Sequence, residues 1–268
     1  MFLIPRRRAS FDSAELGGIG HGENSGAEDG PSVIGGWERA VAEFSGVPYA
    51  ASVGSGRRGM SLILEFLGIR EGDEIVVPSY TLGELMPLVR ESGAIPVPAD
   101  IDPDTWNLSP ESVAQRISGR TRAILAVHLF GNPSGIGSLA ELASSRNIPL
   151  IEDCAHALGA TSCGKAAGSF GYAGFFSFEM TKPVNTFGGG MVVSRDGGLI
   201  DFIKSRTADD IEDSGPVAGK IRATLTEQRL FSTGLSFPFL YALATPSFRP
   251  IMERIYRRSF HAPPRNLR

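Results

Sequence analysis

The sequence contains little lysine and cysteine and has no strong excess of charge of either sign. Only four of its 26 lysine and arginine residues are lysine, so a reaction that needs a lysine amine has few candidates. These are Lys165, Lys182, Lys204 and Lys220. Two cysteines are too few for a disulfide framework or a zinc site, so we expect a cytoplasmic protein without a metal centre. A formal net charge of −3 argues against nucleic-acid binding, which usually needs a basic surface.

Long hydrophobic runs are also scarce. The first residues, MFLIPRRRASF, contain a basic cluster with no apolar run after it, so they do not form a secretory signal. Residues 230–248 contain no charged side chain, but Pro238 and Pro246 interrupt them. We therefore expect a buried or interface segment there rather than a membrane segment.

Glycine, in contrast, is abundant, and its distribution suggests how the chain is organised. The 268 residues include 33 glycines without a collagen repeat, which indicates many tight turns. Residues 1–31 are Gly-rich and weakly periodic, and we expect an N-terminal arm there. We expect one large domain over residues 32–206, followed by a partial C-terminal segment over residues 207–268 that is helical and suited to an interface.

Short apolar runs alternate with helical patterns through the large domain. The expected strands lie within 49–53, 74–80, 94–101, 121–130, 149–156, 173–180 and 190–195, and the expected helices within 37–44, 60–67, 82–91, 110–117 and 138–146. Strands that are apolar throughout are typical of a sheet covered on both faces. The sequence therefore predicts an α/β fold with a mostly parallel sheet sandwiched by helices.

Several polar residues stand directly after these apolar runs. In α/β sheets the ligand lies beyond the carboxyl ends of the strands, so these residues are the first candidates for a site. They include Tyr80, His128, Asn132, Asp153, His156, Ser177 and Lys182.

A glycine-rich turn precedes the helical pattern at residues 60–67. Residues 54–59 (GSGRRG) match the dinucleotide fingerprint G-x-G-x-x-G. That site also needs an acidic residue at the carboxyl end of the second strand, whereas Asp73 and Glu74 precede their strand. The turn at Gly56 and Arg57 remains a candidate anion site, because a helix start offers free N–H groups and a positive dipole end.

Asp153 and Lys182 each end or follow an apolar run, 29 residues apart. That separation leaves room for a connection and one more strand, which would place both at the same edge of the sheet. A lysine amine, a carboxylate and an anion-binding helix start are the groups that pyridoxal 5'-phosphate (PLP) requires. The residues therefore indicate a PLP site.

Several segments also resemble a known family. The runs GDEIVVPSYT, ADIDPDTWNLSPE, RTRAILAVHLFGNP, IPLIEDCAHALGA and GSFGYAGFFSFEMTKPVNTFGGGMVVS resemble the DegT/DnrJ/StrS family of PLP-dependent nucleotide-sugar aminotransferases. The resemblance extends from about Trp37 to Arg195. It implies an aspartate-aminotransferase-like large domain of fold type I.

The resemblance also implies roles for individual residues. Lys182 would be the catalytic Schiff-base lysine, Asp153 the partner of the pyridinium nitrogen, and His156 a contact at the side of the ring. Ser177 and the turn formed by Gly56 and Arg57 would bind the phosphate. The predicted substrate contacts are Tyr80, His128 and Asn132.

The implied activity is transfer of an amino group from an amino acid such as glutamate to a nucleotide-linked keto sugar. Such an enzyme would act in amino-sugar or polysaccharide biosynthesis, as a cytoplasmic homodimer.

The chain departs from the family pattern at four places. Arg57 stands where the family usually has threonine, and Leu82 stands where an aromatic side chain often stacks on the pyridine ring. After the lysine, the family's Gly-acid-Gly-Gly is replaced by Gly188-Gly189-Gly190-Met191. The fourth departure is an incomplete C-terminal small domain, the part that closes the active site in the family. The alternative interpretation is therefore a catalytically incomplete PLP-fold subunit with a regulatory or assembly role.

Overall fold

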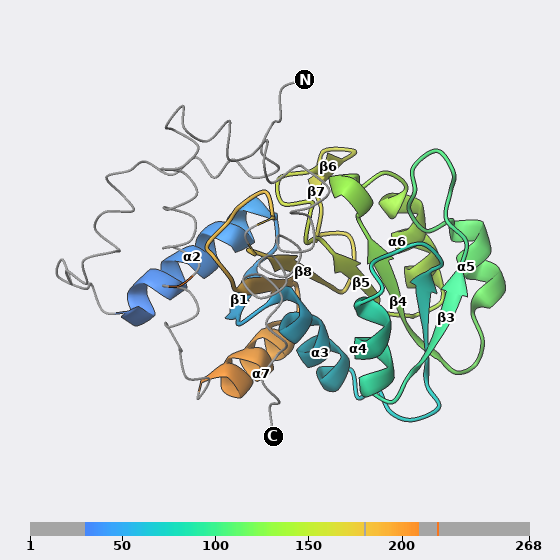
Figure 1. Cartoon of the computed structure of the whole chain (residues 1–268), viewed down its shortest axis with the longest axis horizontal. Coiled ribbons are helices and arrows are strands. Elements are labelled where there is room, and N and C mark those ends of the chain that lie inside the picture. The colour runs from blue at the N-terminus through green and yellow to red at the C-terminus, as the bar shows by residue number, and fades with distance from the viewer. Residues whose placement is uncertain (1–29, 180, 209–218, 220–268) are drawn as a thin grey trace, which may run out of the picture. The chain divides into compact units, whose positions relative to one another are not determined.

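A seven-stranded sheet forms the centre of the fold (Figure 1). The structure is a computed structural model, and it describes residues 30–179, 181–208 and 219. The strands of the sheet are β1 (Tyr49–Val53), β2 (Glu74–Pro78), β3 (Ile95–Ala99), β4 (Thr121–Val127), β5 (Leu150–Asp153), β8 (Ala173–Ser177) and β9 (Gly190–Ser194). A separate hairpin is formed by β6 (Thr161–Ser162) and β7 (Lys165–Ala166).

The strand order is β1-β9-β8-β5-β4-β2-β3. Neighbouring strands from β3 through β2, β4 and β5 to β8 pair in parallel, whereas β9 pairs antiparallel with both β8 and β1. The mostly parallel sheet expected from the sequence is therefore confirmed.

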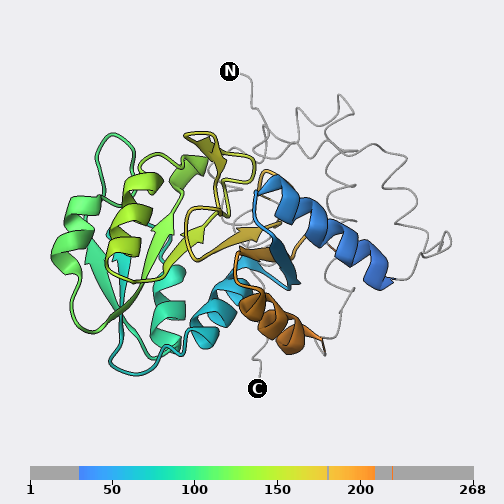
Figure 2. The same ribbon diagram turned by 180° about the vertical axis from the view of Figure 1, so that it is seen from behind.

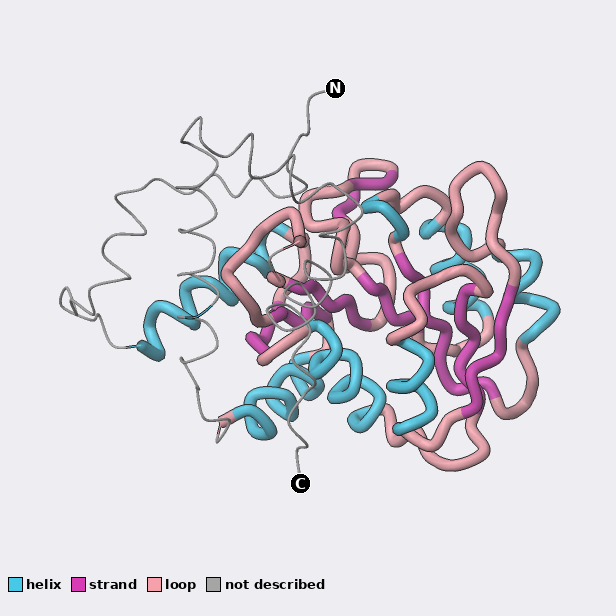
Figure 3. The backbone as a smooth tube through the Cα atoms, viewed as in Figure 1, coloured by secondary structure: helices cyan, strands magenta, loops and turns pink. Residues whose placement is uncertain are grey.

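Helices cover both faces of this sheet, as the two opposite views and the tube drawing show (Figures 1, 2 and 3). They are α2 (Gly30–Phe44), α3 (Gly56–Phe66), α4 (Leu85–Glu91), α5 (Pro110–Arg116), α6 (Ile136–Ser145) and α7 (Gly197–Thr207). Buried side chains of α3, α4 and α7 pack on one face. Those of α2, α5 and α6 pack on the other.

Strand β4 is apolar from Ala123 to Val127, and the helices on its two faces explain why. Leu125 and Val127 face the core on the side of α3, and Ile124 and Ala126 face the core on the side of α6. Successive side chains of a strand point to opposite faces, so the part of a strand that lies between two layers of helices is mostly apolar.

Asp73 and Glu74, the two acidic residues considered above as ribose ligands, lie at the amino end of β2, as the sequence predicts. Glu74 is the first residue of β2, at the edge of the sheet opposite to the carboxyl ends of the parallel strands. Asp73 pairs with Arg122, Nε to Oδ1 at 3.2 Å, and Glu74 pairs with Arg120. Both carboxylates therefore have structural partners, and neither is placed to hold a ribose.

Parts of the predicted domain organisation lie outside the described residues. The described residues 30–208 belong to one compact unit. The predicted arm over residues 1–31 and C-terminal segment over residues 207–268 fall almost wholly outside them, as does the apolar run 230–248, so these remain predictions. None of the described helices is both long enough and apolar enough to cross a membrane.

Candidate active site

The predicted site residues gather at the carboxyl edge of the sheet. Asp153 and Ser177 are the last residues of the parallel strands β5 and β8. His128 directly follows β4, and its backbone N–H donates to the carbonyl oxygen of Asp153 at 3.1 Å. Lys182 lies in the loop between β8 and β9, which returns the chain to this edge.

The amine of Lys182 faces His156. Nζ of Lys182 lies 2.9 Å from Nε2 of His156. Partial burial lowers the pKa of Lys182 below its usual value, although the carboxylates of Asp153, Glu179 and Glu84 oppose this change. Burial and the charge of Lys182 also lower the pKa of His156. A protonated Lys182 amine donates to Nε2 of His156 when that nitrogen carries no proton.

Asp153 is the buried acid of the site, with only 4% of its surface exposed. Its Oδ1 accepts a hydrogen bond from the backbone N–H of Ala155 at 2.9 Å, and no other described residue donates to its carboxyl group. Burial raises the pKa of Asp153, while the nearby charges of Lys182 and His128 act in the opposite direction. A carboxylate held in this way gains from a cationic partner, such as a protonated pyridine nitrogen.

The start of α3 lies against the end of β8. Ser55 caps the helix, because its Oγ accepts from the backbone N–H of Arg58 at 3.1 Å. A Cβ atom at Gly56 would lie 3.1 Å from the carbonyl oxygen of Phe176 and 3.3 Å from Cβ of Ser177. Glycine therefore allows the N-terminal turn of α3 to approach the Ser177 hydroxyl closely, which is the arrangement that binds an anion.

These groups fit PLP. The site offers an amine, a buried carboxylate that makes no ion pair with a described residue, and a helix start beside the Ser177 side chain, which match the aldehyde, ring nitrogen and phosphate of the cofactor. In the loop after β2, Oγ1 of Thr81 is also buried and has no hydrogen-bond partner among the described residues. Lys182, Asp153, His156, Ser177 and the Gly56–Arg57 turn are thus the residues that would hold the cofactor.

His128, which we predicted to contact substrate, is 2% exposed. Its Nε2 lies 2.8 Å from Oε2 of Glu152, which is fully buried. Glu152 also accepts from three backbone N–H groups, those of Gly168 on Oε2 and of Phe170 and Gly171 on Oε1, at 2.7–2.9 Å. His128 is therefore placed to position β5 and its neighbouring loop, and its substrate role remains a prediction.

His128, Glu152 and Cys154 also form the cluster of potential metal ligands in the described part of the chain. Both oxygens of Glu152 already accept backbone hydrogen bonds. The pKa of the Cys154 thiol is raised well above its usual value, first by burial and then by the two neighbouring carboxylates. A neutral thiol and an occupied carboxylate are poor metal ligands, so the cluster acts as a hydrogen-bonded core.

We predict that Glu152→Ala lowers the free energy of unfolding by about 3–5 kcal/mol, because it leaves several buried donors without an acceptor. The change is measured by urea unfolding of the full chain, followed by far-UV circular dichroism. Glu141→Ala, an exposed carboxylate on α6, is the matched control and should change the free energy by less than about 0.5 kcal/mol. Equal effects of the two substitutions would contradict this role of Glu152.

The other two predicted substrate contacts lie in loops beyond the sheet. Nδ2 of Asn132 donates to the carbonyl oxygen of Thr105, and Nδ2 of Asn107 donates in return to the carbonyl oxygen of Asn132 at 2.8 Å. Asn132 thereby ties two loops together. Tyr80 is 52% exposed and its ring packs against that of Trp106, with centroids 5.6 Å apart. Their contacts with substrate remain predictions.

Two residues near this site, Glu152 and Glu84, were not predicted from the sequence. Glu152 stands inside the run PLIE, where a single charged residue in a buried strand is itself a signal of a structural or functional partner. Glu84 stands in the loop after β2, and its Oε2 lies 3.1 Å from Nη1 of Arg57. Glu84 and Arg57 are 27 positions apart in the sequence, and no local pattern connects them.

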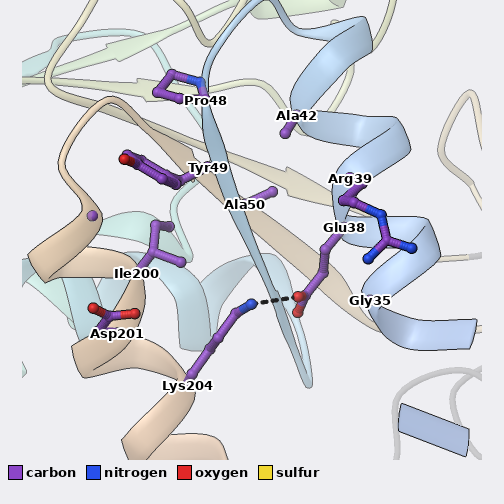
Figure 4. Close-up of a pocket in the computed structure, with 11 residues that line it drawn as sticks. Gly35, Glu38, Arg39, Ala42, Pro48, Tyr49, Ala50, Ile200, Asp201 and Lys204 are labelled. Carbon is purple, nitrogen blue, oxygen red and sulfur yellow. Dashed lines mark ion pairs between the residues drawn. The ribbon is translucent and has the colours of Figure 1, made fainter. Parts of the chain in front are cut away.

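A pocket of about 340 Å³ lies elsewhere, between α2, β1 and α7 (Figure 4). Nζ of Lys204 and Oε2 of Glu38 approach to 2.7 Å across it, and Oε1 of Glu38 accepts from the backbone N–H of Ser52. None of the predicted site residues lines this pocket. Its ion pair joins α2 to α7.

Comparison with known proteins agrees with the geometry of the site. A model of the DegT/DnrJ/EryC1/StrS aminotransferase family matches residues 24–214. The chain is 42% identical to GDP-perosamine synthase of Escherichia coli O157:H7 over 165 residues, covering 62% of this chain and 45% of the relative. It is 34% identical to L-glutamine:2-deoxy-scyllo-inosose aminotransferase of Streptomyces fradiae over 218 residues, covering 81% of this chain and 51% of the relative.

Solved structures show the same likeness. The crystal structure of DesI in the presence of its TDP-sugar product superposes with a TM-score of 0.63 at 37% identity, covering 70% of this chain and 47% of DesI. The expected α/β fold with an aspartate-aminotransferase-like large domain of fold type I is thus confirmed. The chain spans about half the length of the curated relatives that it matches.

Proposed function

Because the chain belongs to the DegT/DnrJ/EryC1/StrS aminotransferase family and shares its PLP cofactor, we propose that it transfers an amino group from an amino acid to a keto sugar. The observation that carries this proposal is the convergence of Lys182, His156 and Asp153 at one edge of the sheet, beside the start of α3.

PLP, when bound, supplies an aldehyde that bonds to amines and a ring that withdraws electrons from the carbon next to the bonded nitrogen. Nζ of Lys182 holds the cofactor and then acts as a base, taking the proton from the α-carbon of the donor. The lowered pKa of Lys182 suits this role, because more of the amine is neutral near pH 7. On the acceptor, Nζ returns a proton to the carbon that receives the amino group.

The surrounding residues would orient the cofactor and keep its ring nitrogen protonated. The Asp153 carboxylate stabilises a proton on the ring nitrogen, which strengthens the electron-withdrawing power of the ring. His156 accepts the hydrogen bond of Lys182 while the imidazole is neutral. Ser177 and the first turn of α3 bind the phosphate and fix the position of the ring.

The acceptor in this proposal is a nucleotide-linked keto sugar, and the donor is glutamate. Relatives named for GDP-perosamine and a solved relative with a TDP-sugar product support a nucleotide-linked acceptor. The relative from Streptomyces fradiae is named for L-glutamine and for 2-deoxy-scyllo-inosose, so glutamine and a free cyclic ketone are the second pair of substrates. A role in amino-sugar or polysaccharide biosynthesis, a homodimer and a cytoplasmic location complete the proposal.

The test uses the purified full chain loaded with PLP, with glutamate and glutamine supplied separately as donors. We expect glutamate to be converted to 2-oxoglutarate, and GDP- or TDP-linked 4-keto-6-deoxy sugars to gain an amino group, detected by mass spectrometry. Amination of 2-deoxy-scyllo-inosose alone would move the acceptor to the second class. A chain that binds PLP but releases no keto acid with either donor would contradict the enzyme and favour the regulatory or assembly subunit.

A further inference from the structure

An ion pair stands at the start of α3, directly beside the proposed phosphate site. Arg57 is the second residue of the helix, and its Nη1 lies 3.1 Å from Oε2 of Glu84. Glu84 occupies the N-cap position of α4, yet its side chain makes no capping hydrogen bond there. The carboxylate of Glu84 is therefore directed to Arg57 instead of to its own helix.

Both side chains of the pair lie within electrostatic reach of Lys182. The negative charge of Glu84 raises the pKa of Lys182, and the positive charge of Arg57 lowers it. The side chains are 59% and 67% exposed, respectively. The pair thus stands at the solvent side of the site, where a guanidinium group and the free N–H groups of a helix start both attract an anion.

A phosphate group would be a stronger partner for Arg57 than Glu84 is. An exposed ion pair contributes little to stability, because water solvates both charges. A dianionic phosphate at a helix start offers Arg57 a charge-assisted hydrogen bond with matching geometry, which is stronger than the exposed pair. The guanidinium group of Arg57 carries a single positive charge, so Glu84 and the phosphate compete for it.

We propose that Glu84 sets the affinity of the site for phosphate by competing for the guanidinium group of Arg57. In the cofactor-free chain Glu84 holds Arg57, and a phosphate group takes Arg57 from Glu84 when it binds. This inference rests on the proposed function, because the phosphate is that of PLP. It gives the residue that replaces the usual threonine a charged partner that tunes cofactor affinity.

The test is a double-mutant cycle of Arg57→Ala and Glu84→Gln in the full chain. Dissociation constants are measured for PLP and for pyridoxal, which has the same ring and aldehyde but no phosphate, by titration of the visible absorbance. We expect Glu84→Gln to tighten PLP binding about two- to fivefold, and Arg57→Ala to weaken it about tenfold. In the Arg57→Ala background, Glu84→Gln should change the affinity less than about twofold.

A comparison of pyridoxal with PLP distinguishes an effect on phosphate binding from an effect on Lys182. Glu84→Gln also alters the protonation of Lys182, and this change affects both ligands equally, so the ratio of the two dissociation constants reports on the phosphate alone. Two substitutions near the pair are matched controls: Arg58→Ala in the same turn of α3, and Glu91→Gln at the other end of α4. Both should leave this ratio within about twofold of the wild type.

Three results would overturn the inference. If Glu84→Gln tightens PLP binding equally with and without Arg57, Glu84 acts directly on the phosphate and not through Arg57. If Glu84→Gln has no effect while the wild type binds PLP, the competition does not exist and the proposed function still stands. If the wild type binds no PLP, the inference fails together with the proposed function.

Discussion

With Lys182 replaced by alanine, the chain should transfer amino groups at least about 10³-fold more slowly than the wild type. The substitution removes both the amine that bonds to the cofactor and the base that moves the proton. The other described lysines are Lys165 in the β6–β7 hairpin and Lys204 in α7, and neither is among the charges that act on Asp153. The rate is measured as keto acid released from the donor at saturating PLP.

Lys165→Ala is the control for this prediction, because Lys165 is an exposed residue of the β6–β7 hairpin and is not one of the proposed site residues. It should keep its rate within about twofold of the wild type. Far-UV circular dichroism of both variants establishes that they are folded. A Lys182→Ala variant that is folded and retains a rate within tenfold of the wild type would refute the assignment of the catalytic lysine.

Asp153→Asn should reduce the rate of amino transfer about 10²-fold or more, because the carboxylate that stabilises the protonated ring nitrogen is lost. Asparagine has the same shape and retains an oxygen that can accept from the N–H of Ala155. The loss should therefore appear in the rate of the reaction rather than in the fold.

The stability of the cofactor-free chain provides a second measurement for Asp153. Burial raises the pKa of this carboxyl group, so its charged form is less stable in the folded chain than in the unfolded chain. At pH values above this raised pKa, replacing the charge with a neutral amide removes that cost. The urea midpoint of cofactor-free Asp153→Asn should consequently equal or exceed that of the wild type at pH 8. A clearly lower midpoint together with an unchanged rate would show that Asp153 is structural.

The positions of the strands along the chain could be predicted because each strand is marked by a local signal, a short apolar run. The mostly parallel pairing followed from the alternation of these runs with helical patterns. A strand between two layers of helices is mostly apolar, as from Ala123 to Val127 in β4, and such runs are visible without a structure. Because Asp153 and Ser177 stand at the carboxyl ends of such runs, they could be predicted to lie at the same edge of the sheet. The same logic excluded Glu74 from a ribose site, since it begins its strand.

Helix boundaries were less predictable. The helix pattern at Met60–Leu67 begins at Gly56 in the structure, and α7 was not predicted at all. Glycine is a poor helix former, so a helix that begins at Gly56, or at Gly197 and Gly198, gives a weak local signal. Ser55 and Asp196 cap these two helices, and packing on the sheet supplies the remaining stability.

The electrostatic neighbours of the site could not be predicted from local patterns. Glu84 meets Arg57 only because the loop after β2 and the start of α3 lie at the same edge of the sheet. The hydrogen bond between Lys182 and His156 likewise joins residues 26 positions apart. Contacts of this kind depend on strand order, which the sequence does not specify, since β9 inserts between β8 and β1.

The central claim, that Lys182 bonds to the cofactor at this edge of the sheet, can be tested most directly by chemical trapping. The full chain is loaded with PLP, reduced with sodium borohydride to make the bond permanent, and digested for peptide mass mapping. The four lysines of the chain lie in separate segments, so the attachment can be assigned to one of them. We predict that the cofactor is found on Lys182 and on no other lysine. Attachment to Lys165, Lys204 or Lys220 instead, or to none of the four, would contradict the site described above.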